Sequence, residues 1–313
     1  MMALAYIFPG QGSQYPGMGK NLVENFSVAK RIFEEADDAL QFLISKLCFE
    51  GSVEDLQLTE NTQPAIFTTS AAVFRTVQSE GFPVPEFVAG HSLGEYSALF
   101  GASSLSLPDA VRTVRSRGRY MQEAVPVGTG AMAAVIGAEL KDIEAACEEA
   151  AQGKVCAPAN INSPNQVVIA GNAEAIDRAI ELLKARGAKR VVKLNVSAPF
   201  HCALMEPAQE RLAADLNAIQ FQNLTTPLVT NVDAAVITNG TEARDALVRQ
   251  VTAPVRWLES VELLINEGVD TFVELGPGKV LTGLMRQINR DVKCLNVEDT
   301  ASLKSTSAAL GLK

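Results

Sequence analysis

The sequence Gly90-His91-Ser92-Leu93-Gly94 places one serine between two glycines where a strand turns into a helix. Upstream, residues 87–89 form a short apolar run after Pro85, which indicates the end of a buried strand. Downstream, residues 94–100 have helical spacing and no proline, and strand, Gly-x-Ser-x-Gly, helix is the pattern of a nucleophile elbow. The turn needs both glycines because a Cβ would collide with nearby backbone. We therefore expect the Ser92 hydroxyl to stand clear of the sheet, beside free N–H groups at the helix N-terminus.

A serine hydroxyl becomes a good nucleophile only when a general base takes its proton. The chain contains two histidines, His91 and His201. His91 adjoins Ser92, and neighbouring side chains at such a turn point in different directions. We interpret His91 as a hydrogen-bonded ring that supports the elbow. By elimination His201 is the expected base, the alternative being a helix N-cap or a surface histidine.

No carboxylate between the serine and the histidine makes a convincing third member of a triad. Asp109, Asp142 and Asp177 each fall at a predicted helix start, where a carboxylate already has a capping or first-turn role. A main-chain carbonyl that accepts the Nδ1–H of His201 would fix the tautomer instead.

Arg117 falls on the apolar side of the helix predicted over residues 108–124. That stripe is formed by Ala110, Val114, Arg117 and Met121. A guanidinium that points inward needs an anionic partner, because an unpaired buried charge is very costly. The partner is either an internal carboxylate or an acidic ligand that Arg117 grips with two hydrogen bonds. A serine nucleophile nearby favours a substrate that carries a carboxylate.

The glycine-containing loop at residues 10–14 follows a predicted strand. It is not a dinucleotide fingerprint, because Tyr15 stands where the third glycine is required. We expect a backbone N–H of this loop and the N–H of Leu93 to form an oxyanion hole. Gly276-Pro277-Gly278 is interpreted as a strand-to-helix turn.

The pattern of elements predicts an α/β protein with two lobes. Residues 1–126 and 198–313 alternate strands with helices, which indicates a large lobe with a mostly parallel sheet. Among these elements we expect a helix over about residues 22–47 and a strand over 227–232. Residues 127–197 read β-α-β-β-α-β, a ferredoxin-like unit inserted as a small lobe. The predicted strands of this unit are 131–137, 154–159, 166–170 and 189–196, and its helices are 139–151 and 173–186. A binding cleft is expected where the lobes meet.

Bulk composition excludes several classes of function. The 313 residues carry a net charge of −9, which argues against nucleic acid as the main partner. No apolar run reaches the ~18 residues that a membrane span needs, and residues 2–9 lack the basic flank of a signal peptide. Five scattered cysteines fit reduced thiols in the cytoplasm, and two histidines make a His-rich metal site impossible. We expect no metal and no cofactor.

Taken together, the motifs resemble those of the malonyl-CoA:acyl carrier protein transacylases of type II fatty acid synthesis. The resemblance covers about residues 4–300 and implies an α/β-hydrolase-like large lobe with a ferredoxin-like small lobe. The segments that carry it are Phe8-Pro9-Gly10-Gln11-Gly12-Ser13-Gln14, Thr62-Gln63-Pro64-Ala65, residues 90–96, Arg117-Gly118, residues 128–132, Asn162-Ser163-Pro164, Pro199-Phe200-His201 and residues 274–278.

The resemblance also implies roles for individual residues. Ser92 matches the acylated nucleophile and His201 its base. Arg117 matches the residue that grips the malonyl carboxylate. The backbones of Gln11 and Leu93 match the oxyanion hole.

Two further positions match the same family. Gln250 falls where a main-chain carbonyl orients the histidine, which would explain the absent triad acid. Leu93 after the serine and Phe200 before His201 look like the malonyl-type pattern.

The resemblance implies an acyltransferase that moves malonyl from coenzyme A to the phosphopantetheine thiol of acyl carrier protein through a malonyl-serine intermediate. The implied partners are malonyl-CoA and acyl carrier protein, and we expect a cytoplasmic monomer. The alternative enzyme is a serine thioesterase or esterase, which would pass the acyl group to water. The alternative that is not an enzyme is a non-catalytic module that binds carrier proteins. Lys189-Arg190, at the start of the last strand of the small lobe, is a candidate docking site for the carrier.

Overall fold

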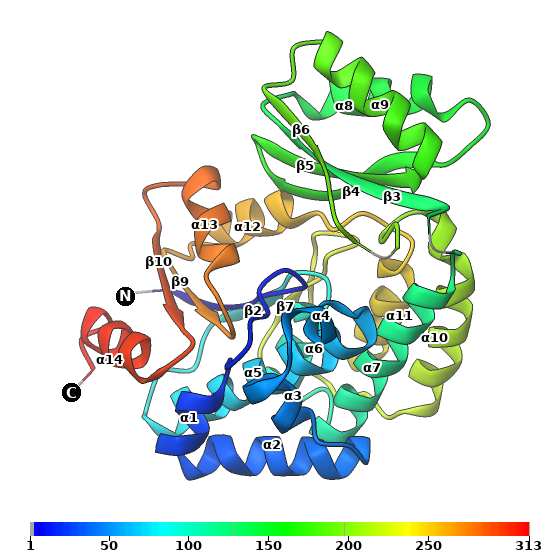
Figure 1. Ribbon diagram of the computed structural model, residues 1–313. Coiled ribbons are helices and arrows are strands. Elements are labelled where there is room, and N and C mark those ends of the chain that lie inside the picture. The colour runs from blue at the N-terminus through cyan, green and yellow to red at the C-terminus, as the bar shows by residue number, and fades with distance from the viewer. Residues whose placement is uncertain (1–2, 127, 197, 313) are drawn as a thin grey trace.

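The structure, a computed structural model, describes residues 3–126, 128–196 and 198–312. Its elements form two sheets, and the smaller one lies above the larger body in Figure 1. The larger sheet has the order β10-β9-β1-β2-β7-β8. Its strands are β1 (Leu4–Phe8), β2 (Phe87–Gly90), β7 (Leu228–Val229), β8 (Val236–Ile237), β9 (Thr271–Leu275) and β10 (Lys293–Val297).

The larger sheet is parallel from β10 to β7, and only the edge strand β8 runs antiparallel. All five residues of β1 are buried. This is the pattern of a central parallel strand, because crossover helices cover both faces of such a sheet. The predicted α/β class with a mostly parallel sheet is confirmed.

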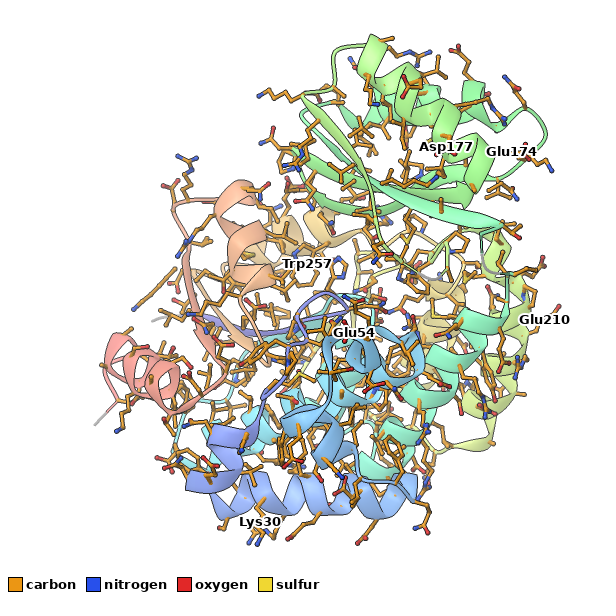
Figure 2. The ribbon with its side chains drawn as sticks, viewed as in Figure 1. Lys30, Glu54, Glu174, Asp177, Glu210 and Trp257 are labelled. Atoms are coloured by element: carbon orange, nitrogen blue, oxygen red, sulfur yellow. The ribbon has the colours of Figure 1, made fainter. Side chains whose placement is uncertain are left out.

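Helices cover both faces of the larger sheet. Their bounds are α1 (Lys20–Asn25), α2 (Ser27–Leu40), α3 (Ile44–Glu50), α4 (Val53–Gln57), α5 (Thr59–Ser79), α6 (Gly94–Gly101), α7 (Leu107–Glu123), α10 (Glu206–Ala218), α11 (Gly240–Gln250), α12 (Trp257–Asn266), α13 (Val280–Ile288) and α14 (Thr300–Ala309), with a short 3₁₀ turn, η1, at Ala203–Met205. In Figure 2, Trp257 lies in the interior, whereas the exposed Lys30 and Glu210 lie at the rim.

The smaller sheet is antiparallel throughout, with the order β4-β5-β3-β6. Its elements are β3 (Gly130–Ile136), α8 (Leu140–Ala151), β4 (Cys156–Ser163), β5 (Gln166–Asn172), α9 (Ala173–Ala185) and β6 (Arg190–Lys193). This order and connectivity are those of the predicted ferredoxin-like unit.

The two faces of the smaller sheet have different neighbours. Ala131, Ala133 and Val135 of β3 pack with residues of α8 and α9, which lie on the outer side in Figure 1. Met132, between them in the sequence, belongs to the core of the large lobe instead. This alternation follows from the two-residue period of a strand. The inner face of the small sheet therefore packs against the large lobe.

Several element predictions need correction. The helix expected over residues 22–47 is interrupted, because Phe26 is extended and Gln41 adopts a left-handed φ of 56°. The strand expected at 227–232 shrinks to β7, and β10 and α14 were not predicted. The expected lobe boundaries each involve a residue, 127 or 197, that lies outside the described ranges. Within those ranges, every helix is too short or too polar to cross a membrane.

Candidate active site

Ser92 lies in a sharp turn between β2 and α6, with a left-handed φ of 52°. A Cβ on Gly90 would come within 1.9 Å of the Gly94 backbone, and one on Gly94 within 2.1 Å of the Phe8 carbonyl oxygen. Only glycine therefore fits at both positions, as the sequence predicted. A positive φ at a non-glycine residue stores strain, and such residues cluster at functional sites.

Asn231, which follows β7, holds the turn in place. Its Oδ1 accepts a hydrogen bond from the Ser92 N–H at 2.6 Å, and its Nδ2 donates to the Gly90 carbonyl oxygen at 2.7 Å. The side chain is fully buried. These two bonds satisfy backbone groups that a tight turn leaves unpaired.

His201 lies in the loop before η1, also with a left-handed φ, of 58°. Its Nε2 is 2.7 Å from Ser92 Oγ, and its Nδ1 is 2.9 Å from the Gln250 carbonyl oxygen. Because a carbonyl only accepts, Nδ1 carries the proton and Nε2 is left to accept one from the serine. The backbone carbonyl thus occupies the place of a triad acid.

The environment keeps His201 neutral. Burial of the ring, and next the positive charge of Arg117, lower the pKa of His201 to about 3. The imidazole is therefore available as a proton acceptor at any pH near neutrality.

Arg117 projects from α7 into the interior and is 2% exposed. Its Nη1 donates to Gln63 Oε1 at 2.7 Å, and its Nη2 donates to Gln250 Oε1 at 2.9 Å and to Ser92 Oγ at 3.0 Å. No carboxylate forms an ion pair with it among the described residues. Two neutral amides hold the guanidinium beside Ser92, so every direct hydrogen-bond partner of its Nη atoms is uncharged.

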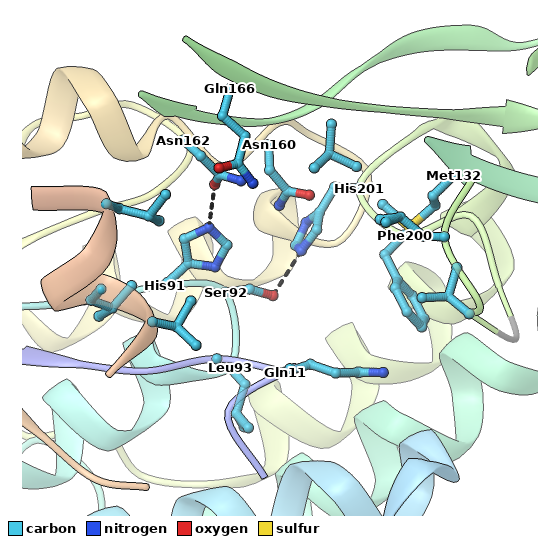
Figure 3. Close-up of a pocket in the computed structure, with 18 of the residues that line it drawn as sticks. Gln11, His91, Ser92, Leu93, Met132, Asn160, Asn162, Gln166, Phe200 and His201 are labelled. Carbon is cyan, nitrogen blue, oxygen red and sulfur yellow. Dashed lines mark hydrogen bonds between the residues drawn. The ribbon is translucent and has the colours of Figure 1, made fainter. Parts of the chain in front are cut away.

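These residues meet at a cavity of about 580 Å³ between the two sheets. Met132, Asn160 and Gln166 line it from the small lobe, and Gln11 and Leu93 line it from the large lobe. In the view of Figure 3, Gln11 and Leu93 lie below Ser92, whereas His201 lies above it. Within the described part of the chain, the backbone N–H groups of Gln11 and Leu93 donate to no protein acceptor.

His91 points away from Ser92, toward the small lobe. Its Nε2 lies 2.8 Å from Asn162 Oδ1 on β4, as the dashed line in Figure 3 shows. The ring also packs against Trp257, with centroids 5.7 Å apart. Burial lowers the pKa of His91, so this ring is neutral as well. The expected supporting role agrees with these contacts, which also join the elbow to the small lobe.

Sequence reasoning missed four polar residues at this site: Gln63, Glu95, Asn162 and Asn231. The first three lie in the segments that carried the family resemblance, but no argument from residue chemistry assigned them a contact. Asn231 lies two residues after the end of β7, and no local sequence pattern assigns it a contact. Among residues 3–126, 128–196 and 198–312, no group of three His, Cys, Asp or Glu side chains is placed to hold a metal ion.

Comparisons of this chain with a family model, with curated proteins and with solved structures all point to the same family. The acyl transferase domain model matches residues 5–306. A malonyl CoA-acyl carrier protein transacylase of Escherichia coli K12 is 51% identical over 288 residues, covering 92% of this chain and 93% of that protein. A crystal structure of an acyl carrier protein S-malonyltransferase from Vibrio cholerae has a TM-score of 0.95 and 47% identity, covering 97% of this chain and 99% of that one.

A further solved structure is a type II PKS acyl-carrier protein in complex with its malonyl-transacylase. Its TM-score is 0.96 at 46% identity, with 98% of this chain and 99% of that chain covered. The chain belongs to the acyl transferase domain family and, within it, to the malonyl CoA-acyl carrier protein transacylases.

Proposed function

We propose that this chain transfers a malonyl group from coenzyme A to the phosphopantetheine thiol of an acyl carrier protein, as a cytoplasmic enzyme that supplies fatty acid elongation. The observation that carries the proposal is a serine that contacts both a neutral histidine and an arginine without a direct ion-pair partner in the described part of the chain. The first pairing activates a nucleophile, and the second selects an acyl group that ends in a carboxylate.

In the first half-reaction, His201 Nε2 takes the Ser92 Oγ proton while Oγ attacks the thioester carbonyl. The backbone N–H groups of Gln11 and Leu93 hold the oxyanion of the tetrahedral intermediate. The intermediate collapses, the C–S bond breaks, and His201 returns its proton to the sulfur. Coenzyme A leaves as its thiol and Ser92 carries a malonyl ester.

Arg117 has suitable N–H groups for the malonyl carboxylate. A guanidinium has five N–H donors. One on Nη1 is bound to Gln63, one on Nη2 to Gln250, and the other on Nη2 points at Ser92 Oγ. Once Oγ becomes an ester oxygen it is a weaker acceptor. That N–H and the second N–H on Nη1 can then bind a carboxylate in a bidentate manner.

In the second half-reaction the carrier's thiol occupies the place that coenzyme A left. His201 takes the S–H proton, the thiolate attacks the ester carbonyl, and Ser92 Oγ leaves with the proton from His201. Atoms and charges balance without metal or redox chemistry.

We further propose that the lobes divide at 126/127 and 197/198, since the cavity between the sheets is lined from both sides of these boundaries.

Intact mass spectrometry tests the proposal. The protein mixed with malonyl-CoA should gain one malonyl group, and addition of holo acyl carrier protein should remove it. Ser92→Ala should gain none. Ser97→Ala is a matched control, because Ser97 is buried in α6, outside the cavity. Rapid release of free malonate from malonyl-CoA alone would instead identify a thioesterase.

A further inference from the structure

Glu95 is a fully buried carboxylate in the first turn of α6, three residues after the nucleophile. It does not line the cavity. Its Oε2 accepts hydrogen bonds from Gln250 Nε2 at 2.8 Å and from the Asn231 N–H at 3.1 Å. Its Oε1 has no hydrogen-bond partner in the described part of the chain. A buried ionised oxygen without a partner is costly, so this carboxylate needs an explanation.

A single amide group separates Glu95 from Arg117. The Gln250 amide accepts from Arg117 Nη2 on its oxygen side and donates to Glu95 Oε2 on its nitrogen side. Glu95 and Arg117 are both buried, and each charge acts favourably on the other across this bridge. Glu95 is thus an internal counter-charge for the arginine that the proposed substrate carboxylate also needs.

We infer that Glu95 shares the charge of Arg117 in the free enzyme, and that it takes up a proton from solvent when the carboxylate of an acyl substrate binds Arg117. This inference rests on the proposed function. No bond of the substrate changes in this step: one proton leaves the solvent and bonds to a carboxylate oxygen of Glu95. Glu95 touches no substrate and acts through Arg117 only.

The physical reason is that one guanidinium cannot compensate two carboxylates in a buried region. Burial raises the pKa of Glu95 to about 7, against the hydrogen bonds from Gln250 and Asn231 and the charge of Arg117, which lower it. A substrate anion on Arg117 cancels that last contribution. The pKa of Glu95 then rises further, and the side chain is protonated in the complex.

The other charged or titratable groups around Glu95 do not replace it in this role. Burial raises the pKa of Tyr96 far above neutrality, and His201 is already neutral. Asp233, on the loop after β7, raises the pKa of Glu95 and is itself paired with Arg249 at the surface. Glu95 is the group near Arg117 whose pKa lies close to the working pH.

The direction of the pH effect follows. Below about pH 7 the free enzyme already holds the proton, so malonyl binding takes up none. Above about pH 7 the Glu95 carboxyl is ionised in the free enzyme and must gain a proton when malonyl binds. The preference for malonyl over acetyl therefore falls as pH rises. The ratio of kcat/KM for malonyl-CoA to that for acetyl-CoA reports this alone, because both substrates share the titrating phosphates of coenzyme A.

The test measures this ratio from pH 6 to pH 9 in the wild type, Glu95→Gln and Asp233→Asn. In the wild type it should fall at least about threefold above pH 7. In Glu95→Gln, which keeps the shape and loses the charge, it should be independent of pH. In Asp233→Asn, the control that removes one nearby negative charge, the fall should persist with its midpoint at lower pH.

A second measurement needs no variant. Calorimetry of wild-type acylation at pH 8, in buffers of different ionisation enthalpy, should show proton uptake with malonyl-CoA beyond that with acetyl-CoA. A ratio that is flat in the wild type, equal uptake with both substrates, or a fall that survives in Glu95→Gln would overturn the inference. Failure of the proposed function is distinguishable, because no malonyl-Ser92 adduct would then form at any pH.

Discussion

The Nη2 atom of Arg117 lies 3.0 Å from the Oγ atom of Ser92, within hydrogen-bond distance of the nucleophile. The same oxygen lies 2.7 Å from Nε2 of His201. The group proposed to select the acyl chain, Arg117, and the proposed general base, His201, thus meet on one atom. After burial, the charge of Arg117 is the largest cause that lowers the pKa of His201, so we expect a carboxylate bound to Arg117 to raise that pKa.

Replacement of Arg117 by alanine should collapse the preference for malonyl. Loss of the buried partner strands the substrate carboxylate, and we expect malonyl transfer to fall about 10²-fold or more. Acetyl transfer should fall far less, because an acetyl group leaves the guanidinium unpaired in the wild type. The ratio of the two kcat/KM values is the measurement that decides.

Arg117→Lys separates charge from shape. It keeps the positive charge but loses the planar fork, so it should restore malonyl transfer only in part. If either variant slows both substrates equally, Arg117 acts only by supporting Ser92 and not by selecting the substrate.

Removal of the histidine base should slow acylation without abolishing the binding of malonyl-CoA. We expect His201→Ala to cut the acylation rate at least about 10²-fold, the usual contribution of general-base catalysis. Rapid-quench mass spectrometry measures the adduct directly. Near-normal acylation of this variant between pH 6 and 9 would place the base elsewhere.

The same histidine makes the fold sensitive to acid. Its pKa is about 3 in the folded protein and 6.5 without the fold, so the unfolded chain binds more protons between these values. This contribution to stability is complete above about pH 6.5 and is lost as pH falls toward 3. Urea unfolding at several pH values should show a smaller loss for His201→Gln, which does not titrate. Equal losses would contradict the assigned pKa.

The fold, and the meeting of Ser92, His201 and Arg117 at one cavity, could be predicted because their signals are local. The glycines around Ser92 and the apolar stripe under Arg117 are visible in a few residues of sequence. The orienting carbonyl has no signal of its own, because any residue type offers a main-chain oxygen, and only family resemblance pointed to Gln250.

The polar residues that support the site could not be predicted from local sequence. Asn231 reaches the elbow from 139 residues away, and Gln63 reaches Arg117 from 54 residues away. Such contacts depend on how the helices pack against the sheet. The late strand β10 was missed because its residues Lys293–Val297 alternate weakly and no glycine turn precedes them.

The tight turn around Ser92 predicts how glycine substitutions change the free energy of unfolding. Gly90→Ala should destabilise the protein by about 3 kcal/mol or more, because its Cβ would meet backbone atoms that cannot move aside. Gly283→Ala is the matched control, since that exposed helical position has no atom within 4 Å of an added Cβ. It should stabilise the protein by about 0.5–1 kcal/mol. Chemical denaturation of both variants measures the difference, and a neutral Gly90→Ala would contradict the turn geometry.

Docking of the carrier protein gives the last prediction. Acyl carrier proteins are generally acidic, and a chain of net charge −9 must meet them through a local basic patch. Arg190 pairs with Ile136, whose partner on the other side is Gln166 of the cavity wall, so Lys189 and Arg190 lie near the cavity and are exposed.

Reversal of both charges, Lys189→Glu with Arg190→Glu, should raise the carrier-protein KM several-fold at low salt and flatten its salt dependence. The matched control reverses Lys30 and Arg31, which are exposed on α2, where Figure 2 places Lys30 far from the small lobe. The two double variants have the same net charge, so long-range repulsion of the acidic carrier is similar in both. An equal change in KM for the two would therefore assign the effect to net charge, and docking would have to use another surface.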